Sequence, residues 1–230
     1  MRTCIIVPIK TLNKRLPGKT FKLLDQKPLY QYLFTTLKQA LDEKIVDSIM
    51  IDSSDKEVLE IARNWGFTPS ERPEEFNSDT TAGDQLISRV ILNLSEFDII
   101  GEFHITSPFL SLETIKKAII TIKSNNSLDS VFGVVPRYNR FWMKEKPINH
   151  DTKFLIRTQD LTPVLEEADF YLFRRESFLK FNKRVSGIIE TIPVSKVEGV
   201  DIDYLEDFIY AESLLAANLV PNFARLNQKA

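Results

Sequence analysis

Apolar and polar residues follow one another along the start of the chain in a strand-and-helix rhythm. Residues 3–8 are continuously apolar and β-rich, which is typical of a strand covered on both faces. Residues 27–44 then carry apolar side chains at helical spacing, at Leu29, Tyr32, Leu33 and Leu37. The pattern therefore predicts a strand, a loop and a helix.

A second unit of the same kind follows directly. Residues 45–51 predict a strand and residues 54–66 a helix, with Ser54 or Asp55 as its N-cap and Gly66 as its stop signal. The later part of the chain continues the alternation. Helices are expected over 80–97, 111–126, 176–181 and from Asp203 to about Leu219, and strands over 98–105, 129–136, 168–175 and 187–194.

Strands that alternate with helices predict an α/β fold: a mostly parallel sheet with helices on both faces. Ligands of such sheets collect at the carboxyl ends of the strands, so the loops after the strands are the places to search. The alternation breaks between about 138 and 163, where short polar and aromatic pieces predict hairpins. We expect one domain over residues 1–230, with an inserted segment at about 138–165.

Composition and charge narrow the range of partners. The 30 Lys and Arg residues against 32 Asp and Glu give a net charge of −2, without the basic surplus that nucleic-acid binding needs. No segment reaches the length of a membrane span, and the amino terminus does not resemble a signal peptide. The single cysteine, Cys4, is expected to be a buried thiol. We therefore expect a cytoplasmic protein that binds neither nucleic acid nor membranes.

The loop after the first strand concentrates positive charge. Lys10, Lys14, Arg15 and Lys19 lie between a buried strand and a helix, where backbone amides and cations often bind phosphate. The same loop has only Gly18 and does not match the glycine-rich phosphate-binding pattern. From spacing alone, phosphate binding and a solvated basic loop are both open.

Near the other end of the chain, Asp201 and Asp203 are two residues apart in extended sequence. Their carboxylates then point the same way, which suits a hard divalent cation such as Mg²⁺. The alternative for Asp203 is a helix N-cap, with Glu206 as the partner three residues later. That alternative leaves Asp201 unexplained.

Several blocks in order resemble the acylneuraminate cytidylyltransferases, the CMP-sialic acid synthetase family. The opening "VPIKTLNKRLPGKTFKLLDQKPLYQYLFTTL" is followed by "DSSDKEVLEIARNWGF", "ERPEEFNSDTTAGDQL", "FHITSPFL", the segment from "TQDLTP" to "FYLFRR", and "GVDIDYLEDFIYAESLL". The resemblance covers nearly the whole chain. It implies a Rossmann-like nucleotidyltransferase sheet in three layers, with a dimerisation excursion and a homodimer.

The resemblance also implies an activity: Mg²⁺-dependent transfer of CMP from CTP to the anomeric hydroxyl of an acidic nine-carbon sugar, with release of pyrophosphate. Residue by residue, it implies catalytic roles for Lys14, Lys19 and Asp201, and metal binding by Asp201 and Asp203. It implies nucleotide binding by Lys10, Arg15, Arg72, Asp79, Thr80 and Thr81, and sugar binding by His104, Thr106, Ser107 and Gln159. Helix capping is an equally good local explanation for Asp79 or Thr80. For His104, the alternative to sugar binding is a structural role.

The departures from the family pattern gather on the sugar side. Thr11 and Leu12 stand where the family has a Gly-Gly pair, His104 replaces a glutamine, Phe109-Leu110 replaces Leu-Arg, and Ala168-Asp169 replaces Asn-Gly. We therefore expect cytidylyl transfer, with sialic, legionaminic, pseudaminic or 3-deoxy-octulosonic acid as the acceptor. Two alternatives are a glycosyltransferase with an Asp-x-Asp metal site, and a catalytically idle relative that binds nucleotide or a partner enzyme.

Overall fold

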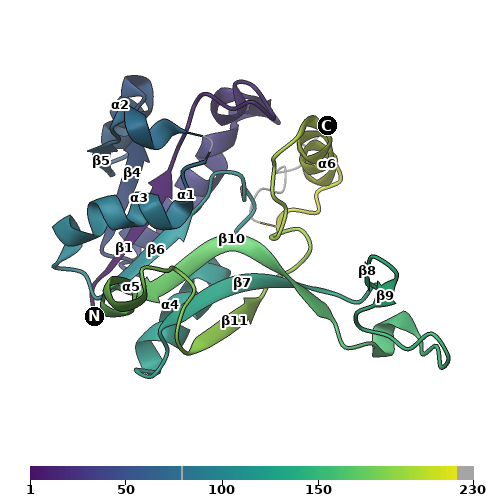
Figure 1. Cartoon of the computed structure of the whole chain (residues 1–230). Helices are drawn as coiled ribbons and strands as arrows, with labels where there is room; N and C mark the ends of the chain where they lie inside the picture. Colours follow the sequence, from purple (N-terminus) through teal and green to yellow (C-terminus); the bar gives the residue numbers. More distant parts are fainter. Residues whose placement is uncertain (79, 222–230) are drawn as a thin grey trace.

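The computed structural model, which describes residues 1–78 and 80–221, is built on a seven-stranded sheet (Figure 1). The strand order is β11-β7-β10-β6-β1-β4-β5. These strands are β1 (Thr3–Pro8), β4 (Ser48–Ser53), β5 (Thr68–Glu71), β6 (Ile99–Phe103), β7 (Ser130–Arg137), β10 (Val164–Arg174) and β11 (Ile189–Pro193). Only β10 runs antiparallel to its neighbours, β6 and β7, within this sheet of described residues. The predicted mostly parallel sheet is confirmed.

Helices cover both faces of the sheet. They are α1 (Leu29–Asp42), α2 (Lys56–Asn64), α3 (Gly83–Val90), α4 (Leu112–Ser124), α5 (Arg175–Phe181) and α6 (Leu205–Ala216). One apolar cluster joins α1, α2 and α4 to one face of the sheet. A second cluster joins α3, the 3₁₀ turn η3 (Ile91–Leu94) and α5 to the other face. The result is the expected three-layer arrangement, and α6 packs on a third cluster beside α1.

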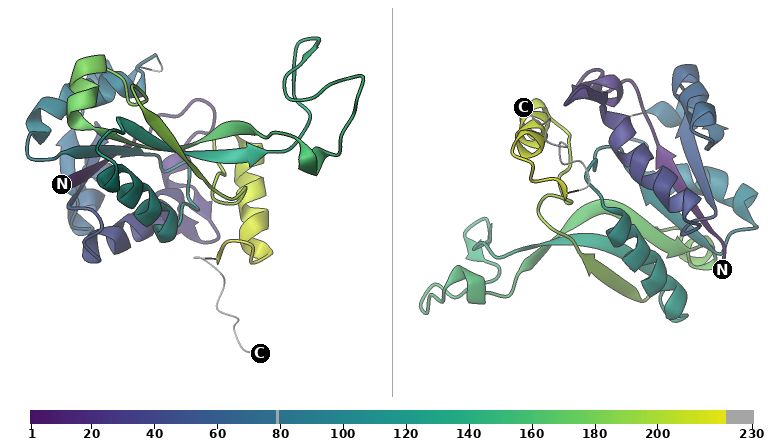
Figure 2. Two further views of the ribbon diagram at one scale, coloured as in Figure 1. Left: turned by 90° about the horizontal axis from the view of Figure 1, so that it is seen from below. Right: turned by 180° about the vertical axis from the view of Figure 1, so that it is seen from behind.

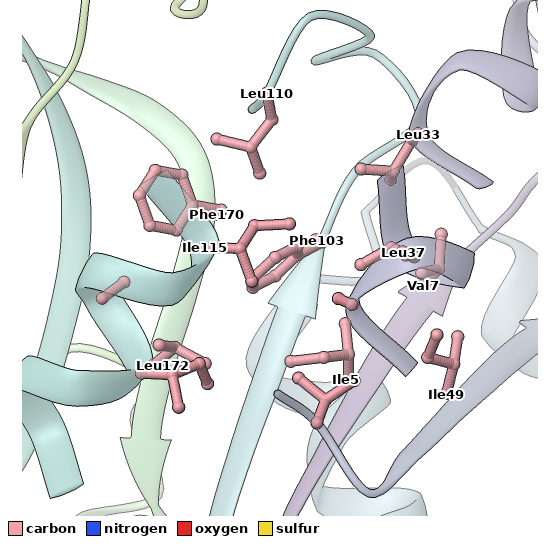
Figure 3. Packing of buried hydrophobic residues seen from close by; sticks show 14 of the residues in the cluster. Ile5, Val7, Leu33, Leu37, Ile49, Phe103, Leu110, Ile115, Phe170 and Leu172 are labelled. Carbon is pink, nitrogen blue, oxygen red and sulfur yellow. The ribbon is translucent and has the colours of Figure 1, made fainter. Parts of the chain in front are cut away.

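The core explains why the sequence predicted β1 as a continuously apolar strand. Figure 3 shows Ile5 and Val7 of β1 beside Leu33 and Leu37 of α1, and each of these side chains is fully buried. Side chains from β1 point to both faces, since Cys4 and Ile6 belong to the second cluster. A central strand buried on both faces needs apolar residues at every position.

Local signals set the ends of the helices as expected in two cases. The Asp55 carboxylate accepts the backbone N–H of Glu57 and caps α2, and Gly66 follows this helix at a φ of 75°. The Ser111 hydroxyl accepts the backbone N–H of Thr114 and caps α4. These caps satisfy amides that have no partner inside the helix.

The helix expected over 80–97 begins later than expected and divides into α3 and η3. The N-cap of α3 is Ala82, whose backbone N–H binds the Gln85 side chain. Thr80 therefore does not cap the helix, and Asp79 lies outside the described residues. The sequence pattern also missed β5, because its polar residues show no apolar alternation and gain strand geometry by pairing with β4.

Residues 138–163 form an arm that projects away from the body of the molecule (Figures 1 and 2). It contains a small hairpin of β8 (Trp142–Met143) and β9 (Lys146–Pro147) and the 3₁₀ turn η4 (Thr158–Asp160). A similar minor hairpin, β2 (Leu23–Leu24) with β3 (Lys27–Pro28), precedes α1. Among the described residues, no helix is both long and apolar enough to span a membrane.

Candidate functional site

Two adjoining pockets lie at the carboxyl ends of β1 and β6. The first, called here the cationic pocket, has a volume of about 540 Å³ and is lined in part by Lys10, Lys14, Arg15, Lys19, Arg72, Thr81 and His104. The second, the mixed-charge pocket, has a volume of about 330 Å³. Its lining includes Lys10, Arg15, Lys19, His104, Thr106, Asp169, Arg184, Asp201 and Asp203. These volumes suit small-molecule ligands.

The loop after β1 and the segment before α6 meet at this edge of the sheet (Figure 1). The Arg15 guanidinium forms an ion pair with the Asp203 carboxylate. The Lys19 ammonium donates to Asp203 Oδ1 at 3.1 Å and to the Ile202 carbonyl at 2.8 Å. Only 8% of the Lys19 side chain is exposed, so this contact is a fixed part of the fold. Arg15 and Lys19 thus share one site with Asp203, which lies more than 180 positions away.

The first loop keeps its shape without the family's Gly-Gly pair. The Asn13 side-chain amide donates to the Lys10 carbonyl at 2.8 Å, and Gly18 turns the chain at a φ of 70°. Thr11 and Leu12 are absent from the positive-φ positions among the described residues. The backbone at 11–12 therefore does not require glycine for its conformation.

Three carboxylates come together across the mixed-charge pocket: Asp169 of β10, Asp201 and Asp203. Although Asp201 is exposed as a residue, partial loss of hydration raises the pKa of its carboxyl group to about 7, with Asp169 and Asp203 adding repulsion. A hydrogen bond from Thr106 and the Lys19 charge oppose that rise in pKa. Crowded carboxylates of this kind are stabilised by a cation.

The donor set fits Mg²⁺ bound jointly with phosphates. No group of three or more His, Cys, Asp or Glu side chains with metal-binding geometry occurs in the part of the chain that the structure describes. Mg²⁺ commonly takes one or two protein carboxylates and completes its shell with water and substrate phosphates. Asp201 and Asp203 are the two residues that would hold it.

The structure excludes the helix-cap alternative for Asp203. The N-cap of α6 is Tyr204, and the Asp207 carboxylate accepts the backbone N–H groups of Asp203 and Tyr204 at 3.0 and 2.8 Å. Glu206 is not the capping partner. Asp203 is therefore left to face Arg15 and Lys19 in the pocket.

Arg72 lines the cationic pocket, but its guanidinium is anchored below it. Arg72 Nε donates to Asp52 Oδ2 at 2.7 Å, and its Nη2 donates to the Asp52 carbonyl at 2.8 Å. Arg89 of α3 forms a second ion pair with Asp52. The Arg72 and Asp52 side chains are only 3% and 2% exposed, so the buried pair stabilises the wall beside the pocket.

The remaining predicted site residues differ in how near they lie to the two pockets. Thr80 lines an adjacent pocket of about 670 Å³ that shares Lys10 and Lys14 with the cationic pocket. Ser107 is buried after β6 and lines neither the cationic nor the mixed-charge pocket. Gln159 is exposed in η4 of the arm, away from both pockets. The fold therefore does not bring Ser107 or Gln159 into the pocket lining of this chain.

The polar groups around the pockets that sequence reasoning missed include Asn13, Glu102 and Arg184. A carboxylate inside the apolar run of β6 was the available signal for Glu102. Arg184 gave no such signal, because its partners Asp84 and Glu102 are 100 and 82 positions away. Only the folded chain places them together.

Comparison with known proteins gives one family match. The model of the family described as "Cytidylyltransferase" matches residues 4–212. N-acylneuraminate cytidylyltransferase A of Danio rerio is 25% identical over 208 residues, covering 87% of this chain and 47% of that protein. CMP-N,N'-diacetyllegionaminic acid synthase of Legionella pneumophila is 28% identical over 235 residues, covering 95% and 98%. The chain spans about half the length of the fish relatives that it matches.

A solved structure of CMP:2-keto-3-deoxy-manno-octonic acid synthetase, in complex with CTP, has a similar fold. The TM-score is 0.69 at 14% sequence identity, and the alignment covers 94% of this chain and 99% of that one. At this identity the likeness concerns the fold alone.

Proposed function

The chain belongs to the cytidylyltransferase family, and on that premise we propose that it transfers CMP from CTP to the anomeric hydroxyl of an acidic sugar. The hydroxyl oxygen forms a bond to the α-phosphorus of CTP, the bond between this phosphorus and the bridging oxygen breaks, and pyrophosphate leaves. The hydroxyl proton passes to solvent or to a base in the pocket.

One observation supports the proposal most directly: Arg15 and Lys19 of the first loop contact the Asp203 carboxylate before α6. In phosphoryl-type transfer, negative charge on the phosphates must be stabilised, so fixed cations are the main catalytic contribution of the protein. The Lys19 ammonium is held in place by the Ile202 carbonyl and the Asp203 carboxylate. In the proposal, Lys14 and Lys19 bind the phosphates, and Lys10, Arg15, Arg72 and the 79–81 segment surround the nucleotide.

Mg²⁺ is the proposed cofactor, held by Asp201 and Asp203. When bound, it supplies positive charge to the phosphates and lowers the repulsion they present to an incoming hydroxyl. The ion would also relieve the crowding that raises the pKa of Asp201. The protein's own part is to keep both carboxylates at the pocket, with Asp207 bonded to the backbone N–H of Asp203.

The acceptor is proposed to be an ulosonic acid, of the nonulosonic type or a relative. The named activities of the relatives concern neuraminic, legionaminic, pseudaminic and octulosonic acids, so several acceptors share this chemistry. We place the acceptor in the mixed-charge pocket, where His104 and Thr106 line the wall beside Asp201. Ser107 then supports this wall from the interior.

We also propose a homodimer formed through the arm. Trp142, Met143, Phe154 and Leu155 are each at least half exposed, and a separate chain would leave this apolar surface in water. Gln159 belongs to the same arm. In this proposal, it contacts the sugar that is bound in the pocket of the partner subunit.

The deciding experiment measures pyrophosphate release from CTP and Mg²⁺ with a panel of ulosonic acids. We expect release only when CTP, Mg²⁺ and one of these acids are present together. Silence across the panel would remove the proposal. CTP binding in calorimetry without turnover would indicate an idle relative, and cleavage of a ready-made CMP-sugar without pyrophosphate formation would indicate a glycosyltransferase.

A further inference from the structure

A buried carboxylate lies at the end of β6, directly under the two pockets. Glu102 pairs across the sheet with Ile6 of β1 and Tyr171 of β10, and its side chain has no exposed surface. A buried carboxylate is costly unless cations or hydrogen-bond donors surround it. Such a group in the centre of a sheet therefore calls for an explanation.

Arg184 holds one oxygen of this carboxylate. Its Nη1 donates to Glu102 Oε2 at 2.8 Å, its Nε donates to Asp84 Oδ1 at 3.2 Å, and its guanidinium lies over the Tyr171 ring at 4.5 Å. Gly83 packs directly on this pair, since a Cβ there would fall 2.7 Å from Arg184 Cζ and 2.9 Å from Glu102 Oε1. The pair is thus fixed by α3, β10 and the loop after α5.

The second oxygen faces His104. Glu102 Oε1 is buried and has no hydrogen-bond partner of good geometry among the described residues, while His104 Nε2 lies 3.4 Å away. The His104 side chain is 29% exposed and lines both pockets. His104 therefore connects a buried carboxylate to the space in which ligands bind.

The surroundings of His104 favour its charged form. Burial by itself lowers the pKa of the imidazole, but the close approach of the Glu102 carboxylate and the charge of Asp169 outweigh burial, so the pKa is raised. Arg184 opposes this rise. Lys10, Arg15, Lys19, Asp201 and Asp203 line the same pocket. The pKa of Glu102 is lowered despite its burial, chiefly by His104 and Arg184.

The charge of the ring decides what His104 can recognise. With Nε2 turned to Glu102, a neutral imidazole offers an acceptor at Nδ1, whereas an imidazolium offers a donor. An acidic sugar brings a carboxylate, which only accepts hydrogen bonds. Arg15 and Lys19 are bonded to Asp203, and Arg184 to Glu102 and Asp84, so these three cations already have carboxylate partners. His104 lines the pocket in which the sugar carboxylate would lie.

We propose that Glu102 is a positioning residue that holds His104 as a doubly protonated donor for the carboxylate of the acceptor sugar, and that Arg184 fixes Glu102 in place. This inference rests on the proposed function for its ligand. Its structural half, the charge state of His104, is independent of any activity.

The first test is an NMR titration of the complete protein without ligands. The chain has only two histidines, so His150→Gln assigns both ring signals. We expect the His104 midpoint above the ordinary 6.5, and a fall of about one pH unit or more in Glu102→Gln. A wild-type midpoint at or below 6.5 would overturn the inference, even if Glu102→Gln does not fold.

The second test compares the KM for the acidic sugar at two pH values. At pH 7.5, Glu102→Gln should raise this KM about tenfold, because an uncharged ring replaces the imidazolium donor, and should leave the KM for CTP within about twofold. At pH 5.5, where the ring protonates without help, the ratio of variant to wild type should fall at least about threefold. The titration of Asp201 affects the KM of the variant and of the wild type alike, so it cancels in their ratio.

His104→Gln is the matched control. Its KM for the sugar should be raised at both pH values, and adding Glu102→Gln to it should have no further effect if Glu102 acts through His104. A Glu102→Gln defect of equal size at pH 7.5 and 5.5, or one that adds fully to His104→Gln, would overturn the proposal. Failure of the proposed function would show differently, as no pyrophosphate from the unmodified protein with any ulosonic acid.

Discussion

Lys19 shows how one side chain can belong to both the fold and the site. Its ammonium satisfies the carbonyl of Ile202 and one oxygen of Asp203, and its stem is buried with the loop after β1. Lys14, five residues earlier, is exposed on the same loop. Similar residues in one basic loop thus have different surroundings, which the sequence spacing alone does not reveal.

The first prediction concerns that ammonium. Lys19→Met keeps most of the stem but removes the charge, so kcat for pyrophosphate release should fall about a hundredfold or more. The unfolding free energy should fall by about 1 to 3 kcal/mol, because the Ile202 carbonyl loses its donor. Lys22→Met is the control: Lys22 lies over the Phe208 ring and outside both pockets, so kcat should stay close to wild type. Equal kcat losses in both variants would contradict the phosphate role.

A second prediction follows from the raised pKa of Asp201. In metal-free protein the folded state holds this proton up to about pH 7, whereas the ordinary value is 3.8. The unfolded state therefore loses the proton first, and the stability contributed by this group falls as pH rises between these values. Asp201→Asn should raise the melting temperature in EDTA, and more at pH 8 than at pH 5, while abolishing turnover with Mg²⁺. A gain in melting temperature that is the same at both pH values would contradict this assignment.

Residue roles were predictable from the sequence where neighbours in the chain decide them. The Asp-x-Asp spacing was sufficient to single out Asp201 and Asp203 as a pair, and Asp55 and Ser111 cap helices as expected. The partnership of Glu102 with Arg184 and Asp84 was not predictable, because only the fold brings these residues together. The capping alternative for Asp203 also needed the structure, since Asp207 and Glu206 are equally suitable by type.

At the scale of elements, the start of α6 couples helix stability to the acidic pair. Asp207 accepts the backbone amides of both Asp203 and Tyr204, so the first turn of the helix sets the direction of the Asp203 carboxylate. A negative charge in the first turn also interacts favourably with the helix dipole. Order in this turn is therefore a condition for the proposed metal binding.

The third prediction tests that coupling. Asp207→Ala should lower the unfolding free energy by about 0.5 to 2 kcal/mol, as expected for loss of a helix cap. It should also raise the Mg²⁺ concentration needed for half-maximal pyrophosphate release, because Asp203 loses its anchor. Glu206→Ala, at the neighbouring exposed position, should change neither quantity appreciably. A denaturant titration and a Mg²⁺ titration at saturating CTP measure the two effects, and an inert Asp207→Ala would refute the coupling.

Elements were predictable from sequence in proportion to their burial. β1 was predictable because it is apolar throughout, and α1 because its apolar residues recur at helical spacing. β5, with the sequence TPSE, has neither pattern and becomes a strand only by pairing with β4 at the edge of the sheet. The direction of β10 likewise depends on its long approach through the arm, and local spacing carries no information about strand direction.

At the scale of the molecule, the site joins the two ends of the chain. The loop after β1 and the segment before α6 meet through Arg15, Lys19 and Asp203. A ligand that bridges these groups adds a bond between regions that are remote in sequence. It should therefore stabilise the whole domain instead of one loop.

The fourth prediction is a melting experiment on that bridge. The complex of CTP with Mg²⁺, taken as one ligand at a hundred times its dissociation constant, should add about 2.7 kcal/mol to the unfolding free energy. Either ligand alone should give less, since the Asp201 and Asp203 carboxylates and the phosphates would each lack a partner. Arg15→Ala should reduce the gain without changing the melting temperature of the free protein much, because an exposed ion pair contributes little stability by itself. A full shift with CTP in EDTA would contradict the joint binding of metal and nucleotide.

The last prediction concerns the arm, whose apolar side chains are exposed to water in a single chain. Met143 and Phe154 are 68% and 77% exposed, and replacing both by Ser should weaken a homodimer at least about tenfold by removing buried apolar area. The body of each chain should melt as before, since neither side chain belongs to the clusters that join the helices to the sheet. Leu92→Ser is the matched control, with a side chain 69% exposed in η3, away from the arm, and should leave the dimer intact. Sedimentation velocity across a concentration series measures both, and a wild-type chain that stays monomeric at tens of micromolar would show that the arm does not pair two copies.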